Sequence, residues 1–346
     1  MARNVVAGSG SVGACIAYHL ALLGARDVVL AERAEIASGS TGKAMGGVRQ
    51  QFSSAAEVRL AQESIAFFEE LGASWFQQVG YLFVATTDVG LAELEERREL
   101  QAELGVPVEQ VDPRFVPGLN ADDVLGAVFC ATDGVADPPA LTREVVRRAA
   151  ELGVDVREHT EARELERDVL VIAAGAYSGD FGVDLPIRPI ARQLLETDPI
   201  EALPDDLPMV VEPESGFHFR RRDDCLRIAM ADAVPRWGFE ETVDESVFAD
   251  RLERLAHRYP AAARTRIARA WAGLYDMTPD AHPIIGPVGD GLYASCGFSG
   301  HGFMQSPAVG RAVAEELLFG ASSLDLTPYR LERFSTEAVF PENLVL

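Results

Sequence analysis

Three glycines near the start of the chain have a spacing that suits phosphate binding. Gly8, Gly10 and Gly13 follow the pattern G-x-G-x-x-G, and Glu32 comes roughly 20 residues after them. The glycines permit a tight turn, a close approach of a pyrophosphate to the backbone, and close packing of the following helix. An acidic side chain placed like Glu32 can accept hydrogen bonds from ribose hydroxyls. Together these residues predict a dinucleotide-binding site.

Two further glycine-rich stretches, residues 38–47 and 297–303, lie far apart in the chain. A long polar loop directly after the first unit suits a ligand longer than NAD, such as FAD, whose ribityl chain and flavin need backbone donors. The alternative is an ordinary surface loop. Arg49 follows the first of these loops. It is either a surface arginine or a side chain that points into the cavity bordered by the loop.

A strand–helix–strand unit must position the first glycines. Residues 5–7 are apolar and read as a buried strand, and residues 28–31 read as a second strand that ends at Glu32. Between them, apolar residues recur at helical spacing up to Gly24, which is a plausible helix stop. Near the other end of the chain, Ser306 can cap and Pro307 can start a helix that runs to about residue 318.

The middle of the chain changes from alternating strands and helices to strands of antiparallel character. Residues 108–125 read as a loop, residues 133–138 as a turn, and residues 158–168 leave little room for extra strands. The pattern indicates an α/β (α+β) protein with antiparallel strands inserted between nucleotide-binding elements. We expect helices over 56–71, 91–104, 139–153 and 246–259, and strands over 80–85, 125–130, 154–156, 168–175, 188–198, 209–212, 216–221, 226–231 and 291–296.

The composition excludes several classes of partner. The formal net charge of −23 over 346 residues argues against nucleic acid and anionic membranes. No apolar run reaches the roughly 20 residues that span a bilayer, and the first strand begins too early to leave room for a signal peptide. The four cysteines form no close pair and the six histidines show no metal-ligand spacing. We therefore expect a cytoplasmic protein with reduced thiols, no metal and no membrane span.

Motifs along nearly the whole chain resemble those of a known family. The chain is similar to the FAD-dependent amine oxidoreductases of the D-amino-acid oxidase superfamily. Within it, the likeness is strongest to the group of sarcosine oxidases, dimethylglycine dehydrogenases and L-proline dehydrogenase β-subunits. The two motifs nearest the end of the chain are specific, whereas many flavin and NAD enzymes share the glycine triplet. The motifs are residues 8–13 with Glu32, and residues 38–47, 133–138, 173–175, 273–286 and 297–303.

The resemblance implies a fold of two discontinuous domains. The FAD-binding domain would be Rossmann-like and comprise residues 1–73, 139–183 and 285–346. The substrate-binding domain, with a large mixed or antiparallel sheet, would comprise residues 74–138 and 184–284. Family members usually carry a strand pair where this chain has the short stretch 158–168, which is either a true deletion or a gap in the sequence.

The resemblance also implies a reaction. A secondary or tertiary amine of an amino acid would lose hydride to flavin N5, and the resulting imine would be hydrolysed. Members with covalent flavin use a cysteine in the motif at 273–275 or a histidine near residues 42–43, and neither is present. FAD should therefore be bound non-covalently. The cofactor-binding residues implied are Gly8, Gly10, Ser11, Val12, Gly13, Glu32, Arg33, Ser40, Thr41, Lys43, Ala44, Met45, Gly46, Gly47, Ala162, Ala174, Gly175, Gly273, Gly297, Gly300, His301, Gly302, Phe303 and Met304.

The chain departs from its relatives at the residues expected to hold the substrate. Monomeric sarcosine oxidases bind the substrate carboxylate with a lysine where this chain has Met304. They also place a lysine over the flavin, where the nearest match is Arg227. Because Lys43 is the only lysine, an arginine should bind the carboxylate, since its planar fork makes two parallel hydrogen bonds. Arg49 is the first candidate and Arg192 the second.

Three other side chains each have two interpretations, and two more have one. Tyr275 lies where the family places side chains near the substrate, or it is a core tyrosine. His301 is catalytic or bonds the loop beside the flavin. His218 faces the cavity or lies on a strand without a role. His282 is expected to shape a turn. Trp271 belongs to the core.

Three hypotheses for the function follow. The first is an FAD-dependent oxidase or dehydrogenase of N-substituted or cyclic amino acids, and the scarcity of lysines favours an acceptor other than oxygen. The second is a flavin-bearing subunit of a hetero-oligomeric electron-transfer complex. The third is an NAD-dependent dehydrogenase. A small-molecule amino acid is the expected partner, and both homo-oligomers and hetero-oligomers stay open.

Overall fold

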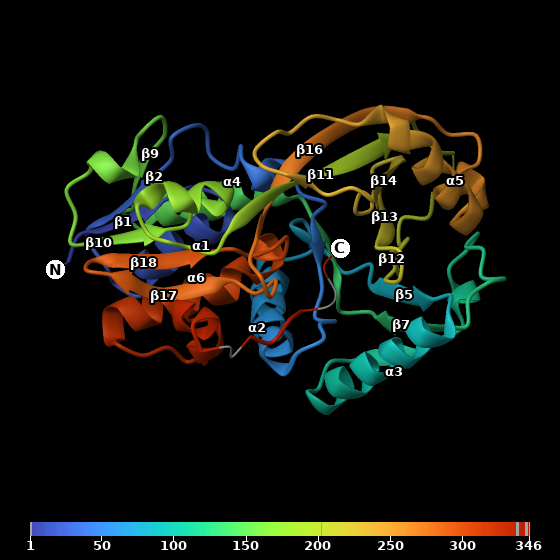
Figure 1. The fold of residues 1–346 in the computed structure, drawn as a ribbon, viewed down its shortest axis with the longest axis horizontal. Helices are drawn as coiled ribbons and strands as arrows, with labels where there is room; N and C mark the ends of the chain where they lie inside the picture. The colour runs from blue at the N-terminus through green and yellow to red at the C-terminus, as the bar shows by residue number, and fades with distance from the viewer. Residues whose placement is uncertain (1, 202, 337–338, 343–344, 346) are drawn as a thin grey trace.

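Two large β-sheets dominate the molecule, and three helices pack on the first of them (Figure 1). The computed structural model describes residues 2–201, 203–336, 339–342 and 345. The first sheet has six strands, all parallel to their neighbours except β17, which runs antiparallel to β18. In spatial order they are β17 (Ile284–Gly289), β18 (Leu292–Cys296), β10 (Val169–Ile172), β1 (Asn4–Ala7), β2 (Val28–Ala31) and β9 (Asp155–Arg157).

The strands at the centre of the first sheet are apolar along most of their length because helices or loops cover both faces. The helices α1 (Ser11–Leu22), α4 (Pro138–Glu151) and α6 (Gly302–Phe319) contribute buried side chains to the core beside this sheet. The crossing of α1 and α6 is close, since a Cβ atom at Gly310 would lie 2.6 Å from the carbonyl carbon of Cys15. The sequence pattern predicted α1 and α4 correctly to within a few residues.

The second sheet is mixed. Its strands pair antiparallel except β12 and β5, which are parallel. The longest strand pair joins β11 to β16. In Figure 1 these two strands extend from beside the first sheet across the top of the second sheet. In spatial order the strands are β15 (Arg236–Trp237), β11 (Arg188–Thr197), β14 (Cys225–Ala229), β13 (Phe217–Arg222), β12 (Met209–Glu212), β5 (Tyr81–Ala85), β7 (Gly126–Cys130) and β6 (Val108–Gln110), with β16 (Ile267–Met277) also paired to β11.

The remaining elements of the described chain are a small sheet, three further helices and several short 3-10 helices. A small sheet joins β3 (Gly47–Val48), β8 (Gly134–Ala136) and β4 (Phe76–Gln77). The other helices are α2 (Ala55–Leu71), α3 (Asp88–Glu103) and α5 (Phe248–Arg258). Short 3-10 helices are η1 (Ser40–Lys43), η2 (Pro113–Phe115), η3 (Ala162–Glu164), η4 (Gly175–Phe181), η5 (Glu245–Val247), η6 (Pro260–Ala262), η7 (Thr327–Tyr329) and η8 (Leu331–Phe334).

The structure corrects the expected start of α6. The sequence placed it at Pro307, but the helix begins at Gly302 and carries Pro307 inside. Proline has no N–H for the carbonyl four residues earlier, which belongs to Phe303. The hydroxyl of Ser306 donates to that carbonyl instead, at 2.8 Å. The freed backbone oxygen is therefore satisfied, and the proline is tolerated.

Seven strands were missed by the sequence pattern, namely β3, β4, β6, β8, β15, β16 and β17. β6 lies within the stretch expected to be a loop, and β8 lies within the expected turn at 133–138. β16 was not assigned at all, because charged and aromatic residues alternate irregularly along it. Both β6 and β8 have only three residues, too few to show an alternating pattern.

The α/β fold with a large mixed sheet is confirmed. The division into two discontinuous domains stays a prediction. It is supported by the origin of the strands, since the first sheet takes them from residues 4–31, 155–172 and 284–296, and the second from 81–130 and 188–277. The connection between β9 and β10 contains only η3, which agrees with the shortness of this stretch.

Candidate active site

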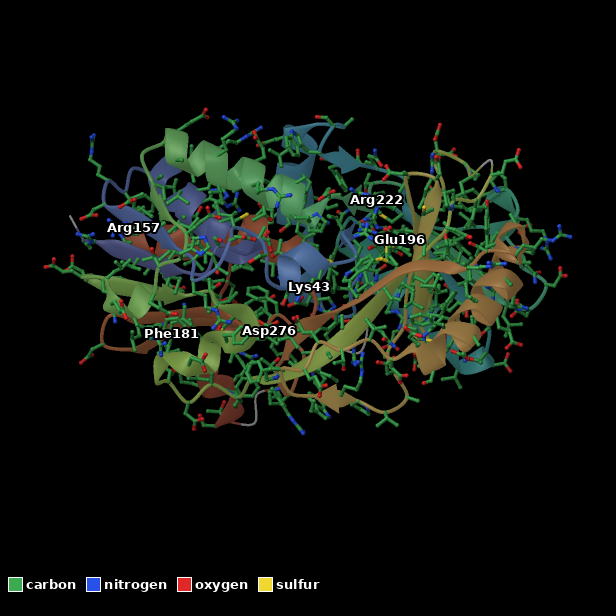
Figure 2. The ribbon with its side chains drawn as sticks, turned by 90° about the horizontal axis from the view of Figure 1, so that it is seen from above. Lys43, Arg157, Phe181, Glu196, Arg222 and Asp276 are labelled. Carbon is green, nitrogen blue, oxygen red and sulfur yellow. The ribbon has the colours of Figure 1, made fainter. Side chains whose placement is uncertain are left out.

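A cavity of about 370 Å³ lies between the first sheet and the second. Figure 2 shows Lys43 and Asp276, both in its wall, between the half that carries Arg157 and Phe181 and the half that carries Glu196 and Arg222. Three strands of the first sheet end side by side here, because Ala7 is in register with Ile172 and with Ala31. The carboxyl ends of adjacent parallel strands form the crevice where such sheets bind ligands.

The turn from β1 into α1 is as tight as the glycine spacing predicted. Gly8 has a φ of +101°, a value that side chains disfavour, and a Cβ atom there would lie 2.5 Å from the carbonyl oxygen of Ala173. A Cβ atom at Gly13 would lie 1.9 Å from the carbonyl oxygen of Gly8. The two glycines therefore let helix α1 begin directly against the end of the strand.

The N-terminus of α1 faces the cavity. Gly10, Ser11 and Val12 line it, and no side chain caps the helix at Gly10. The backbone N–H of Ser11 donates to Oγ1 of Thr41 at 3.0 Å, which ties the loop at 38–47 to the helix. The unpaired N–H groups of a first turn and the positive end of the helix dipole suit a phosphate.

Glu32 lies at the end of β2, in the cavity wall. Its Oε2 accepts hydrogen bonds from the backbone N–H and the hydroxyl of Ser9, at 2.9 and 3.1 Å, and its Oε1 accepts from the backbone N–H of Ala34 at 2.9 Å. These bonds fix the orientation of the carboxylate. A carboxylate has about four acceptor positions, so Glu32 keeps capacity for the hydroxyls of a ribose.

The loop at 38–47 lies between the two sheets. The hydroxyl of Ser40 donates to the carbonyl of Leu274 on β16 at 2.7 Å. Lys43 forms an ion pair with Glu241, and both side chains line the cavity. The loop is thus connected to α1 and to the second sheet, and it is not a free surface loop.

Arg49 is a buried cation in the cavity wall. Its side chain is 1% exposed, and its guanidinium lies 4.1 Å above the ring of Phe52. Nη1 donates to the carbonyl oxygen of Gln51. Burial lowers the pKa of Arg49, and the negative charge of Glu342 opposes this most strongly. An arginine stays protonated in proteins, so the cavity contains a fixed positive charge.

Asp133 organises the backbone around Arg49. This fully buried carboxylate accepts from the backbone N–H of Gln50 at 2.9 Å, and from the side-chain amides of Gln50 and Gln51 at 3.1 and 3.0 Å. Burial raises the pKa of Asp133 to about 6. The motif at 133–138 therefore has a structural part to play, since it holds the strand from which Arg49 projects.

His301 lies against Arg49 and Phe52. Its Nε2 is 3.4 Å from Nη2 of Arg49, and its ring meets the ring of Phe52 edge to face at 5.2 Å. A guanidinium can only donate, so Nε2 is the acceptor in this contact. The ring of Tyr275 packs on Gly300 in the same loop, where a Cβ atom would lie 2.3 Å from it.

Three further polar side chains of the cavity wall are His218, Arg192 and Asp276. Burial lowers the pKa of His218 to about 4, and its Nδ1 bonds the carbonyl of Gly216 at 2.9 Å. The guanidinium of Arg192 lies 5.8 Å from the centre of the Tyr275 ring. Burial raises the pKa of Asp276 to about 6 although its carboxylate accepts from the N–H of Gly297 at 2.7 Å.

Most residues predicted from the sequence lie together in this cavity, and three do not. Gly13 and Gly297 support the turns behind the wall. Arg227 lines a separate pocket of about 230 Å³ and pairs with Glu196 at 2.8 Å. The residues that line the cavity as predicted are Arg49, Tyr275, His301, His218, Arg192, Gly8, Gly10, Ser11, Val12, Glu32, Arg33, Ser40, Thr41, Lys43, Ala44, Met45, Gly46, Gly47, Ala162, Ala174, Gly175, Gly273, Gly300, Gly302, Phe303 and Met304.

Several lining residues were not predicted. Tyr81 and Met209 come from β5 and β12 of the second sheet, and Tyr177 comes from η4. The ring of Tyr177 is covered by the guanidinium of Arg33 at 3.8 Å and stacks on Phe239 at 5.0 Å. Tyr81 begins a strand that the sequence predicted, and this was the available signal, since apolar strands with one hydroxyl often border a cavity.

The two remaining sequence predictions concern Trp271 and His282. Trp271 is half-buried, and its Nε1 donates to the carbonyl of Lys43 at 3.0 Å. His282 is fully buried and bonds Glu57 at 2.9 Å from its Nδ1, so it joins segments far apart in sequence as well as shaping its own turn.

A family model described as FAD dependent oxidoreductase matches residues 3–316. The chain belongs to this family. The FAD-dependent oxidoreductase is 28% identical to the mitochondrial sarcosine dehydrogenase of Mus musculus, over 96% of this chain and 41% of that protein. It is 29% identical to FAD-dependent oxidoreductase domain-containing protein 1 of Xenopus laevis, over 99% of this chain and 84% of that protein. The chain thus spans less than half the length of the sarcosine dehydrogenase.

Among solved structures, the FAD-dependent oxidoreductase is similar to the L-proline dehydrogenase of P. horikoshii. The TM-score is 0.90 at 29% identity, and the match covers 97% of this chain and 98% of that one. The family match favours FAD over the NAD-dependent alternative. Within the described part of the chain, no helix has both the length and the apolar character to cross a bilayer.

Proposed function

We propose that the protein oxidises an amino acid with an N-substituted or cyclic amine, of the sarcosine, dimethylglycine or proline type, to an imine. The observation that carries this proposal is the buried cation of Arg49 in the wall of a cavity whose other end has nucleotide-binding geometry. The chain belongs to an FAD-dependent family, and its relatives include proteins named for sarcosine and for L-proline.

The residues present fit FAD. The turn at Gly8, the N-terminus of α1 and the anchored carboxylate of Glu32 suit the pyrophosphate and a ribose. The backbone at 44–47 and 300–304 lines the rest of the cavity and would bind the ring system. When bound, the flavin supplies the acceptor for the hydride, which no side chain can provide.

The cofactor is bound without a covalent link. None of the four cysteines, all in the described chain, lines the cavity, and the side chain nearest the family's histidine position is Lys43. Acid precipitation should therefore leave the yellow colour in the supernatant. Colour that stays in the pellet would contradict non-covalent binding.

Arg49 binds the substrate carboxylate. A buried guanidinium offers two parallel N–H groups to a carboxylate, and the low dielectric of the site strengthens the contact. The amine must lose its proton before hydride can leave the neighbouring carbon. The site favours this loss, because Arg49 and Arg192 are positive and His218 is neutral near pH 7.

The electron acceptor is a molecule other than oxygen. The only lysine of the chain, Lys43, lines the cavity but is held in an ion pair with Glu241, so it is a poor counterpart for the family's lysine over the flavin. Arg227, the nearest match in sequence, lies outside the cavity. Peroxide release at the rate of substrate oxidation would contradict this assignment.

The decisive experiment is anaerobic bleaching of the flavin by a panel of amines. Sarcosine, dimethylglycine and proline should remove the absorbance near 450 nm, whereas methylamine and pyrrolidine, which lack the carboxylate, should act far more slowly. The two amines are matched controls for Arg49. A protein that takes up FAD but is bleached by no member of the panel would overturn the proposed substrate class.

A further inference from the structure

The stretch that follows α6 returns to the cavity wall. Its last described residues run past α2 toward the centre of the molecule in Figure 1. Glu342 is 4% exposed, and its backbone N–H donates to the carbonyl of Asp280 at 3.0 Å. Its carboxylate accepts from the backbone N–H of Ser53 at 3.1 Å. Ser53 directly follows Phe52, the residue whose ring lies under Arg49.

A network of buried charges holds this stretch in place. His282 bonds Glu57 through Nδ1 at 2.9 Å and the carbonyl of Phe340 through Nε2 at 2.5 Å. Both partners are acceptors, so His282 donates twice and is protonated. Its ring also stacks on that of Phe340 at 4.0 Å. Burial acts to lower the pKa of His282, but Glu57, Asp280 and the carbonyl of Phe340 together raise it.

An ion pair between Arg333 and Asp280 holds η8, which precedes residues 340–342. Arg333 donates to both carboxylate oxygens of Asp280, at 2.8 and 3.0 Å, and to the carbonyl of His282 at 2.9 Å. Asp280 and His282 belong to the motif at 273–286 that the sequence singled out. This motif therefore forms the surface on which residues 340–342 pack.

Glu342 acts on Arg49 from behind the cavity wall. Arg49 lines the cavity and Glu342 does not. Among the charged groups near Arg49, Glu342 has the largest influence in favour of the protonated guanidinium. A buried guanidinium without a negative charge nearby is costly, because its desolvation is not offset. The carboxylate is also tied to the guanidinium through the backbone, because it accepts from Ser53, which directly follows the Phe52 ring under Arg49.

We propose that Glu342 is a positioning residue for substrate binding, which holds the guanidinium of Arg49 at the cavity wall. The inference rests on the proposed function in one respect, since it takes Arg49 to be the carboxylate-binding residue. Contacts with Asp280 and His282 hold Glu342 behind Arg49. The substrate site is therefore complete only when residues 340–342 are packed against this motif.

The test replaces Glu342 in the full-length, FAD-loaded protein. Glu342→Gln keeps an acceptor for the N–H of Ser53 and removes only the charge. We expect the Kd for acetate and benzoate, measured from the change in the flavin spectrum, to rise about tenfold, as does KM, because a displaced guanidinium loses part of its bidentate contact. The kcat should stay within about twofold, since Glu342 does not touch the reacting atoms.

Two further variants make the outcome specific. Glu332→Gln removes the same charge from an exposed position in the same stretch, and it should leave the Kd unchanged. Glu342→Asp keeps the charge on a shorter side chain and should restore part of the affinity. It also provides the measurement if Glu342→Gln does not fold.

The possible results separate the two proposals. Wild-type protein that binds acetate, with Glu342→Gln binding it equally or more tightly, overturns the positioning role and leaves the proposed function intact. A lower melting temperature or FAD content with an unchanged Kd assigns Glu342 a structural role only, and it too overturns the proposal. Wild-type protein that binds neither carboxylate and is bleached by no amino acid overturns both.

Discussion

Nη2 of Arg49 lies 3.4 Å from Nε2 of His301, although 252 positions separate the two residues in the chain. One comes from the strand that follows the loop at 38–47, and the other from the loop that begins α6. The contact places the imidazole of His301 against the guanidinium. Two distant segments of the chain thus meet at this part of the cavity wall.

Replacement of Arg49 should impair substrate binding more than replacement of the other cavity arginine. Arg49→Lys keeps a positive charge but loses the planar fork, so we expect kcat/KM for the best substrate to fall about 100-fold, chiefly through KM. Arg192→Lys is the matched control and should cost less than about tenfold. Anaerobic stopped-flow reduction of the flavin over a range of substrate concentrations measures both. An equal loss in the two variants would contradict the assignment.

Gly13→Ala should weaken both the fold and FAD binding. The new Cβ atom would lie 1.9 Å from the carbonyl oxygen of Gly8, and no rotamer change relieves a clash with backbone. We expect a loss of about 3 kcal/mol in the free energy of unfolding, and less FAD per purified chain. The measurements are thermal melting and the ratio of absorbance at 450 and 280 nm.

The control for this substitution is Gly179→Ala. No atom lies within 4 Å of a Cβ atom at Gly179, and its φ is not in the left-handed region. It should retain the wild-type melting temperature and FAD content. If both alanine variants behave like the wild type, the turn at Gly8 is looser than the structure indicates.

His218 should make the protein less stable as the pH falls from 7 to 5. The unfolded side chain takes up a proton near its ordinary pKa of 6.5, whereas the buried side chain does so only near pH 4. Unfolding therefore binds protons in this window, and the buried neutral histidine costs about 2 kcal/mol of stability between pH 7 and pH 5. Urea unfolding of His218→Gln should show a pH dependence that is weaker by about this amount.

The exposed His159→Gln serves as the control for this prediction. It should retain the wild-type pH dependence. His19, whose pKa burial also lowers to about 4, remains in both variants, so part of the dependence persists. Identical pH profiles for His218→Gln and the wild type would show that His218 is accessible to protons in the folded state.

Tyr177→Ala should loosen the hold on FAD with little effect on folding. The tyrosine ring lies between the guanidinium of Arg33 and the ring of Phe239 at the rim of the cavity. Loss of both contacts should raise the Kd of FAD about tenfold, measured by titration of the apoprotein. Phe319→Ala, which removes a ring that is 65% exposed on α6, should leave the Kd unchanged.

The sequence predicted the nucleotide end of the cavity well because local patterns determine it. Gly8, Gly10, Gly13 and Glu32 lie within one strand–helix–strand unit, and each answers a steric or hydrogen-bonding need of the backbone nearby. All the interactions that require these residue types lie within about 30 consecutive residues. Their positions therefore followed without knowledge of the rest of the fold.

The other side of the cavity could not be predicted in the same way. Tyr81, Met209 and Tyr177 reach the cavity through the pairing of β5 with β12 and through η4. Strand pairing over more than 100 residues leaves no local pattern. Arg227 shows the converse case, since its place in the sequence suggested the flavin whereas the register of β14 turns it toward Glu196.

The buried position of Glu342 could not be predicted from the sequence either. An acidic residue near the end of a strongly acidic chain carries no signal of its own. Its burial depends on His282 and Phe340, which meet only after α6 has packed. Only the folded chain shows that this carboxylate lies behind Arg49.

The interleaving of three segments in the first sheet has a consequence for biosynthesis. β18 pairs with β10, which in turn pairs with β1, so the sheet is incomplete until residues 292–296 have left the ribosome. The cavity at the strand ends takes residues 300–304 from just beyond β18, so its wall is closed only after these residues have been made. A chain interrupted before that point would have the glycine turn of β1 but no closed site.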